Sequence, residues 1–175
     1  FIPGYSFRAK QNQKIMNVSI SRNSLQSALQ NLAKATPTRS TIPIRSSVLF
    51  TARKEKLEMR TTDLEITLVT TAQGSVESEG GVAIPHRTLM DITNALPETD
   101  VTIESNDKHR VVIQTSFGNY DISGAPPEDF PTMPEVDNKK EIGIASSVLK
   151  RLVEKTSFAL RPDDLKPALM GALFE

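Results

Sequence analysis

The sequence contains no cysteine, and this absence removes several kinds of chemistry. Disulfide bonds, thiol catalysis and thiolate metal sites are all excluded. No apolar run approaches the roughly 20 residues that a membrane-spanning helix needs. Residues 1–15 also lack the apolar core of about 7–15 residues that a secretory signal would contain. These absences fit a protein of the reducing cytoplasm that has no membrane partner.

Acidic residues are missing from the first part of the chain. Residues 1–54 contain nine Lys or Arg and no Asp or Glu. Because the whole chain is neutral, the remaining residues carry a net charge of −9. Counted from Met16, the first segment is still +6. This split predicts one surface suited to a polyanion and another that repels it; the alternative is a chance bias enlarged by the N-terminal tail.

Three segments of the chain align without gaps and indicate an internal repeat. They begin at Asn17, Gly81 and Glu141. In each segment, apolar residues first alternate with period two, which predicts a strand. They then recur three and four residues apart, which predicts an amphipathic helix. Ser21 and Ser146 are the predicted N-caps of the first and third helices, because a hydroxyl can accept from a free N–H of the first turn.

Six further segments alternate and are rich in Val, Ile, Leu and Thr, as strands are. They span residues 47–52, 56–62, 65–73, 101–105, 110–115 and 119–123. The repeating unit is therefore a strand, a helix and three strands, used twice in residues 16–123, which predicts an α+β fold. A loop with four prolines follows and indicates an interdomain linker. The predicted divisions are an N-terminal extension expected to be disordered (1–15), a first domain (16–124), a linker (125–140) and the start of a second domain (141–175).

The predicted helices are basic to neutral, whereas residues 97–137 hold nine acids and two bases. The first helix, about residues 22–35, carries Arg22 and Lys34 and no acid. The third, about residues 146–160, carries one acid and three bases: Lys150, Arg151 and Lys155. Helices on one face of a curved body and sheets on the other would give a DNA-compatible side and a DNA-repelling side. Phosphate contacts of this kind are insensitive to base sequence and weaken with salt.

Several motifs in this order resemble the first domain of bacterial sliding clamps, the β subunits of DNA polymerase III. They are TRSTIPIRSSVLF (38–50), LEMRTTDLEITL (57–68), VAIPHRTLMDITNALP (82–97), EDFP (128–131) and LMGALFE (169–175). The resemblance covers residues 16–175 and implies the DNA clamp fold, with helices on the inner face and antiparallel sheets outside. It also implies a longer subunit of three such domains, two of which form a ring.

The same resemblance implies a processivity factor that encircles duplex DNA without sequence preference. Its partners would be the polymerase α subunit, the clamp loader and a second copy of the full-length chain. It would have no cofactor, no metal and no catalytic residue of its own, and would act as an accessory subunit of the polymerase.

The resemblance further assigns roles to individual positions. Arg39 matches a residue that contacts the DNA backbone. Arg87 matches a basic residue that faces the central hole. Asp163 falls in a second DNA-contacting loop, at a position where relatives often have Gln. Because an acid departs from that pattern, Arg161 or Lys166 would make the DNA contact instead. With the helix cations, the predicted DNA-binding set is Arg22, Lys34, Arg39, Arg87, Lys150, Arg151, Lys155 and Arg161. Leu169 matches a wall of the groove that binds peptide motifs, and the predicted seam with a second subunit comprises Ile92, Leu96, Tyr120 and Ile122.

The residues alone leave two other functions open. Asp63 and Glu65 are two residues apart on predicted adjoining strands, and paired carboxylates can perform acid–base catalysis or hold a metal. No third group is tied to them by sequence, which favours a structural role. His86 and His109 lack metal-ligand spacing. His86 is interpreted as a helix-start residue that caps the helix or faces the backbone. His109 is interpreted as the tip of a hairpin. No phosphate loop or dinucleotide fingerprint occurs. The second alternative function is a repeat-built interaction module that does not bind DNA.

Overall fold

The computed structural model describes residues 14–37, 42–132, 143–160 and 170–174. The chain divides into two compact units, Phe1–Met133 and Pro134–Glu175. The described helices of the second unit are α3 (Ser146–Thr156) and a 3-10 helix (Ser157–Ala159). Several residues with predicted roles lie outside the described ranges, and those roles stay predictions: Arg39, Arg161, Asp163, Lys166 and Leu169.

The first unit repeats a strand–helix–strands pattern, as the sequence predicted. Its first half contains β1 (Lys14–Ser21), α1 (Arg22–Leu32), β2 (Ser47–Arg53), β3 (Lys56–Thr62) and β4 (Thr67–Gln73). Its second half contains β6 (Gly80–Pro85), α2 (His86–Ala95), β7 (Asp100–Asn106), β8 (Arg110–Thr115) and β9 (Gly118–Ser123). A short strand that the sequence analysis did not predict, β5 (Ser75–Ser78), joins the halves. Described 3-10 helices are Ala33–Ala35, Pro43–Ser46 and Pro127–Asp129.

The two halves exchange their first strands. β1 pairs antiparallel with β7 of the second half, and β6 pairs antiparallel with β2 of the first half. The resulting sheets have the strand orders β5-β1-β7-β8-β9 and β4-β3-β2-β6. Because each sheet takes strands from both halves, neither half can complete a sheet alone.

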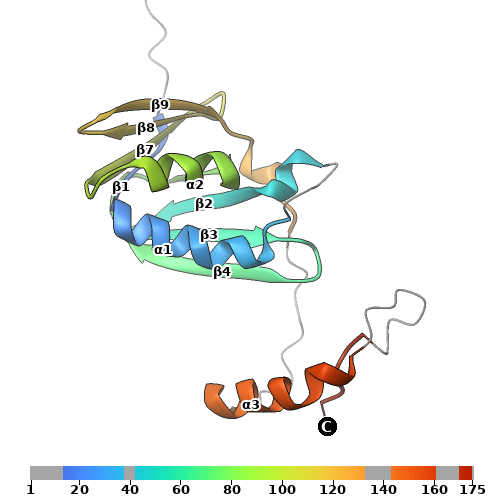
Figure 1. Cartoon of the computed structure of the whole chain (residues 1–175). Coiled ribbons are helices and arrows are strands. Elements are labelled where there is room, and N and C mark those ends of the chain that lie inside the picture. Colours follow the sequence, from blue (N-terminus) through green and yellow to red (C-terminus); the bar gives the residue numbers. More distant parts are fainter. Residues whose placement is uncertain (1–13, 38–41, 133–142, 161–169, 175) are drawn as a thin grey trace, which may run out of the picture. The chain divides into compact units, whose positions relative to one another are not determined.

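The two helices of this unit lie beside one another on the same side of the sheets (Figure 1). α1 contacts β1, β3 and β4, and α2 contacts β2 and β6. The buried stripe of α1 consists of Leu25, Ala28, Leu29 and Leu32. Burying a leucine side chain stabilises a fold by about 1.5–3 kcal/mol, so this stripe is a main source of the affinity between α1 and the sheets. Residues from both helices and both sheets form one core.

The predicted helix caps met different outcomes. The Ser21 hydroxyl accepts a hydrogen bond from the backbone N–H of Ser24 at 3.3 Å, so this N-cap is confirmed. In α3 the prediction was wrong, because Ala145 is the N-cap and makes no side-chain hydrogen bond. Ser146 is instead the first helical residue.

Two predicted boundaries shift. β1 begins at Lys14, so the N-terminal extension cannot reach residue 15. Ala125 forms an antiparallel bridge with Ala83 of β6, with N···O distances of 2.9 and 3.0 Å, and Phe130 is buried. The linker therefore cannot begin at residue 125. Proline-rich sequence suggested a linker, but proline also suits extended segments that pack at the edge of a sheet.

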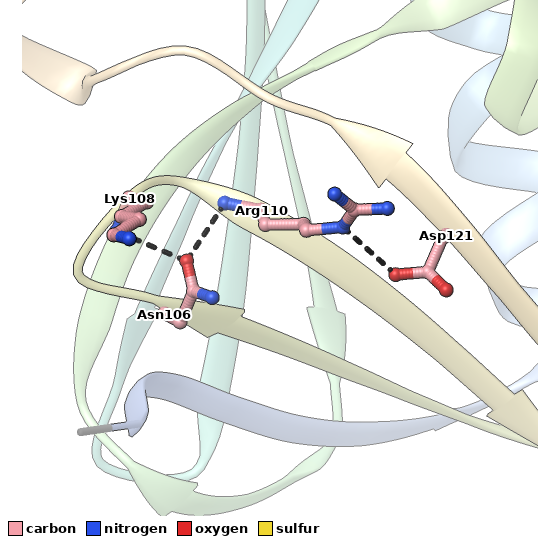
Figure 2. Close-up of polar contacts among 4 residues, drawn as sticks. All are labelled: Asn106, Lys108, Arg110 and Asp121. Atoms are coloured by element: carbon pink, nitrogen blue, oxygen red, sulfur yellow. Dashed lines mark hydrogen bonds and ion pairs between the residues drawn. The ribbon is translucent and has the colours of Figure 1, made fainter. Parts of the chain in front are cut away.

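The turn between β7 and β8 is closed by a side chain (Figure 2). The Oδ1 atom of Asn106 accepts hydrogen bonds from the backbone N–H groups of Lys108 and Arg110, both at 3.0 Å. His109 lies at the hairpin tip, as predicted, with φ 56°, a region that few residues other than glycine adopt. Its carbonyl oxygen accepts from the N–H of Gly124 at 3.0 Å. The β7–β8 hairpin thereby holds the segment that follows β9 and bridges to β6.

Candidate nucleic-acid interface

α1 and α2 run antiparallel, and a side chain at the start of each helix bonds to the backbone of the other. The Nε2 atom of His86, at the start of α2, lies 2.9 Å from the carbonyl oxygen of Leu29. The Nε atom of Arg22, at the start of α1, donates to the carbonyl oxygen of Thr93 at 3.0 Å. The backbone contact of His86 agrees with its predicted role. These two bonds fix the relative position of the helices at both ends.

The solvent-facing side of the two helices is polar and almost free of acid. We call it the helix surface, and it comprises Arg22, Asn23, Gln26, Ser27, Gln30, Asn31, Arg87, Thr88, Asp91 and Asn94. Gln26 receives a hydrogen bond from Arg22 at 2.7 Å and donates one to Asn94 at 2.8 Å. Asp91 is the one acid in the helix surface, and its carboxylate lies 4.0 Å from the Arg87 Nε atom. Such exposed pairs contribute little, so the arginine stays available.

The predicted DNA-binding cations of the first unit differ in their freedom. Arg87 projects into solvent with 95% of its side chain exposed, and Lys34 is exposed in the 3-10 helix that follows α1. Arg22 is half-buried, and its guanidinium group bonds to Thr93 and to Gln26. Arg22 therefore carries charge on this surface but also holds the helices together. Arg and amide side chains of this kind donate hydrogen bonds to phosphate oxygens, which position a protein on DNA without reading bases.

Sequence reasoning found these cations but missed the amides between them. The Gln26–Asn94 bond links residues that are 68 positions apart in the chain. The sequence did contain a signal for these amides, because Asn23, Gln26 and Gln30 recur three and four residues apart along one side of α1. Their pairing with α2 required the fold.

α3 of the second unit separates charge from apolar surface. One side carries the predicted DNA-binding residues Lys150, Arg151 and Lys155, all exposed, with Lys150 at 3.8 Å from Glu154. The other side carries Val148, Leu149, Leu152 and Val153, each 37–47% exposed. Globular domains bury such a stripe against their core. The basic side of α3 is thus the side that a folded domain would leave in solvent.

The side chains predicted at a subunit seam lie partly in the core. Leu96 and Ile122 are only 4% and 6% exposed, and Ile92 and Tyr120 are half-buried against the same core. Residues of a strand alternate between faces, so Ile122 points inward while its neighbour Asp121 points out. Within the described ranges β9 pairs with β8 alone. This narrows the predicted seam to the backbone edge of β9 with Ile92 and Tyr120, because buried side chains cannot meet a partner.

Asp63 and Glu65 do not share a strand face; they lie in the turn between β3 and β4. The Oδ1 atom of Asp63 accepts hydrogen bonds from the backbone N–H groups of Ile66 at 2.7 Å and Glu65 at 2.9 Å. The bond from Ile66 is the main cause that holds the pKa of the Asp63 carboxyl below its ordinary value. Asp63 thus closes a turn, in line with its structural interpretation. In the part of the chain that the structure describes, no three His, Asp or Glu side chains are arranged to hold a metal.

The exchange of first strands between two repeats, with two antiparallel helices on one side of two sheets, defines the DNA clamp fold. A family model described as the N-terminal domain of the DNA polymerase III beta subunit matches residues 16–134, and the chain belongs to this family. The predicted α+β clamp fold is therefore confirmed.

Solved structures and curated relatives agree with this assignment. The DNA polymerase III subunit beta from Pseudomonas aeruginosa superposes with a TM-score of 0.82 at 31% identity, covering 88% of this chain and 42% of that one. The DNA polymerase sliding clamp from Caulobacter crescentus gives a TM-score of 0.80 at 30% identity, with coverages of 85% and 41%. The beta sliding clamp of Pseudomonas putida is 33% identical over 161 residues, which is 91% of this chain and 44% of that protein. The chain thus spans less than half the length of these relatives. Among the described helices, none is long and apolar enough to cross a membrane.

Proposed function

We propose that this chain is the N-terminal part of a DNA sliding clamp, a ring that holds a replicative polymerase on duplex DNA and performs no chemistry itself. The helix surface carries the proposal, in a chain that belongs to the beta-subunit family. It presents Arg87 with a row of amides on the side of the unit away from the sheets, and the exposed Lys34 follows in the 3-10 helix after α1. A mobile contact with DNA needs weak, sequence-independent bonds to phosphates, and this surface offers them.

The proposed ring assigns the remaining residues. Residues 14–133 would form the first clamp domain, and α3 would begin the second, with Lys150, Arg151 and Lys155 turned to the same DNA. Arg39 and Arg161 would add backbone contacts, and Leu169 would form one wall of a groove for peptide motifs of the polymerase α subunit and the clamp loader. The free edge of β9, with Ile92 and Tyr120, would meet a second subunit. Such a protein would act in the cytoplasm, where bacterial DNA is replicated.

The test of this proposal uses the full-length protein and its clamp loader. We would measure retention on nicked circular DNA and on the same DNA after linearisation, at a salt concentration that removes ordinary phosphate contacts. A topological clamp stays on the circle and slides off the linear ends. Equal loss from both substrates would contradict the proposal and favour an interaction module that does not encircle DNA.

A second measurement uses the chain of 175 residues by itself. Only a few phosphate contacts are available to it, so we expect weak DNA binding that falls steeply with salt. The slope of log K against log salt should correspond to a few released counterions. Tight binding that persists in high salt would point to a different mode of recognition.

A further inference from the structure

A groove of about 850 Å³ lies on the sheet β4-β3-β2-β6. Phe50, Leu57 and Met59 of β2 and β3 are fully buried in the core. Their neighbours point to the opposite face, because residues alternate along a strand. The groove therefore occupies the face of this sheet that is turned away from the core. It is lined by Leu49, Thr51, Arg53, Lys54, Glu55, Lys56, Glu58, Arg60 and Thr71.

The residues that line the groove carry a net positive charge. Four cations line it against the carboxylates of Glu55 and Glu58, which leaves a net charge of +2. The strand register places these cations in rows, with Arg53 opposite Lys56 on the adjacent strand and Leu49 opposite Arg60. Charge and apolar surface therefore lie beside one another across β2 and β3.

Arg60 is the fixed cation of this groove. Its side chain is 29% exposed, and one guanidinium nitrogen lies 2.9 Å from Oε1 of Glu58. The Nε atom of Arg60 is buried and has no hydrogen-bond partner among the described residues. Buried polar atoms of proteins are usually paired, so an unpaired one calls for an explanation. A guanidinium group held in this way presents its remaining N–H donors in the geometry that suits a carboxylate.

We propose that this groove binds a short acidic segment of a partner protein, with a carboxylate of that segment on Arg60. Lys56 and Arg53 would hold a second acidic side chain, and Leu49 would contact an apolar one. Glu55 and Glu58 favour a peptide over nucleic acid, because they can accept peptide N–H groups but would repel a strand with a phosphate about every 3.4 Å. The groove and the helix surface lie on different faces of the first unit, so this site would act independently of DNA.

The experiment measures binding of a fluorescein-labelled decapeptide of alternating Glu and Leu to the whole 175-residue chain by fluorescence anisotropy. A peptide with Gln in place of every Glu is the neutral probe. We expect the acidic peptide to bind, and its affinity to fall about tenfold or more in the double variant Lys56→Gln, Arg60→Gln. Lys56→Gln alone, at an exposed position, should lower the affinity by a smaller factor.

The matched control is Arg110→Gln, which removes an exposed arginine of the other sheet that is paired with Asp121 at 3.1 Å. Its affinity for the acidic peptide should equal that of the unaltered chain, and thermal melting should show that every variant folds. Equal binding of the neutral peptide, or an affinity unchanged in the double variant, would overturn the proposal. So would preferential binding of a ten-nucleotide poly-dT strand, which would assign the groove to nucleic acid.

Discussion

The Nε2 atom of His86 lies 2.9 Å from the carbonyl oxygen of Leu29, and this bond joins the first residue of α2 to the last turn of α1. Because a carbonyl oxygen only accepts, the Nε2 atom of His86 must carry a proton. His86 is 9% exposed, so the bond is largely protected from water. The position of the two helices, and with it the helix surface, depends on this contact.

His86→Ala should lower the free energy of unfolding by about 2–3 kcal/mol. The substitution removes the side-chain donor to the Leu29 carbonyl, which keeps only the backbone N–H of Ala33, and it creates a cavity between the helices. Urea denaturation followed by circular dichroism measures the change. Thr88→Ala, at an exposed position of the same helix, should stay within about 0.5 kcal/mol. Similar stability of both variants would show that the bond contributes little.

Arg22→Ala and Arg87→Ala should separate folding from DNA contact. Arg87→Ala should leave stability nearly unchanged, because its side chain is 95% exposed, and should reduce the salt slope of DNA binding by about one. Arg22→Ala should also destabilise the fold by about 1–2 kcal/mol, because its bond to the Thr93 carbonyl is lost. Denaturation and DNA titrations at several salt concentrations check both variants. The idea fails if Arg87→Ala has the salt slope of the unaltered chain.

Gly124→Ala should destabilise the first unit by about 1–3 kcal/mol. An added Cβ would lie 2.7 Å from the His109 carbonyl oxygen and 2.8 Å from a methyl group of Val82, and neither neighbour is a flexible chain end. Gly143→Ala is the matched control, because nothing lies within 4 Å of its Cβ position. Thermal melting compares the two. Equal melting temperatures would mean that the segment after β9 shifts freely.

Asp63→Asn should change how stability depends on acidity. The folded pKa of Asp63 is lowered, mainly by the N–H of Ile66, so the charged form stabilises the fold above the unfolded pKa of about 3.9. This contribution is lost as the pH falls through the folded pKa. The stability difference between the unaltered chain and Asp63→Asn should therefore be largest at neutral pH and shrink below about pH 4. Denaturation curves between pH 7 and pH 3 measure it, and a constant difference would refute the assignment.

Ile122→Ala should act on the fold of a single chain. Its side chain is 6% exposed within the core, and such truncations cost about 2–5 kcal/mol. Asn119→Ala, exposed on the same strand, should cost less than about 0.5 kcal/mol. If Ile122→Ala instead left stability intact and only weakened dimer formation by the full-length protein, the seam first predicted from the sequence would be restored.

Much of this architecture could be predicted from the sequence. Period-two segments predicted β2, β3, β7, β8 and β9 to within a residue or two, and three- and four-residue spacing predicted both helices of the first unit. The absence of acid before Glu55 marked the basic part of the chain. Periodicity reports which side of an element is apolar, and that property belongs to the element alone. The same periodicity places Lys34 and Arg87 on the polar side of their helices, so they could be predicted as exposed cations.

The groove and the turn at Asp63 could not be predicted in this way. Leu49 and Arg60 lie on different strands, and only the register of β2 with β3 makes them neighbours. Asp63 and Glu65 were placed on strands, but Leu64 between them has φ 84°, which no strand contains. The backbone bonds that Asp63 accepts there depend on that local conformation.

The sequence by itself determined the repeated unit, its helices and strands, the separation of charge and the family. Only the tertiary structure decided that β1 joins β7 and β6 joins β2, that Leu96 and Ile122 belong to the core, and that Arg22 holds two helices together. The physical reason is that hydrophobic patterning selects a face for each element but not a partner. Strand partners and buried contacts follow from how all the apolar faces of the first unit close one core together.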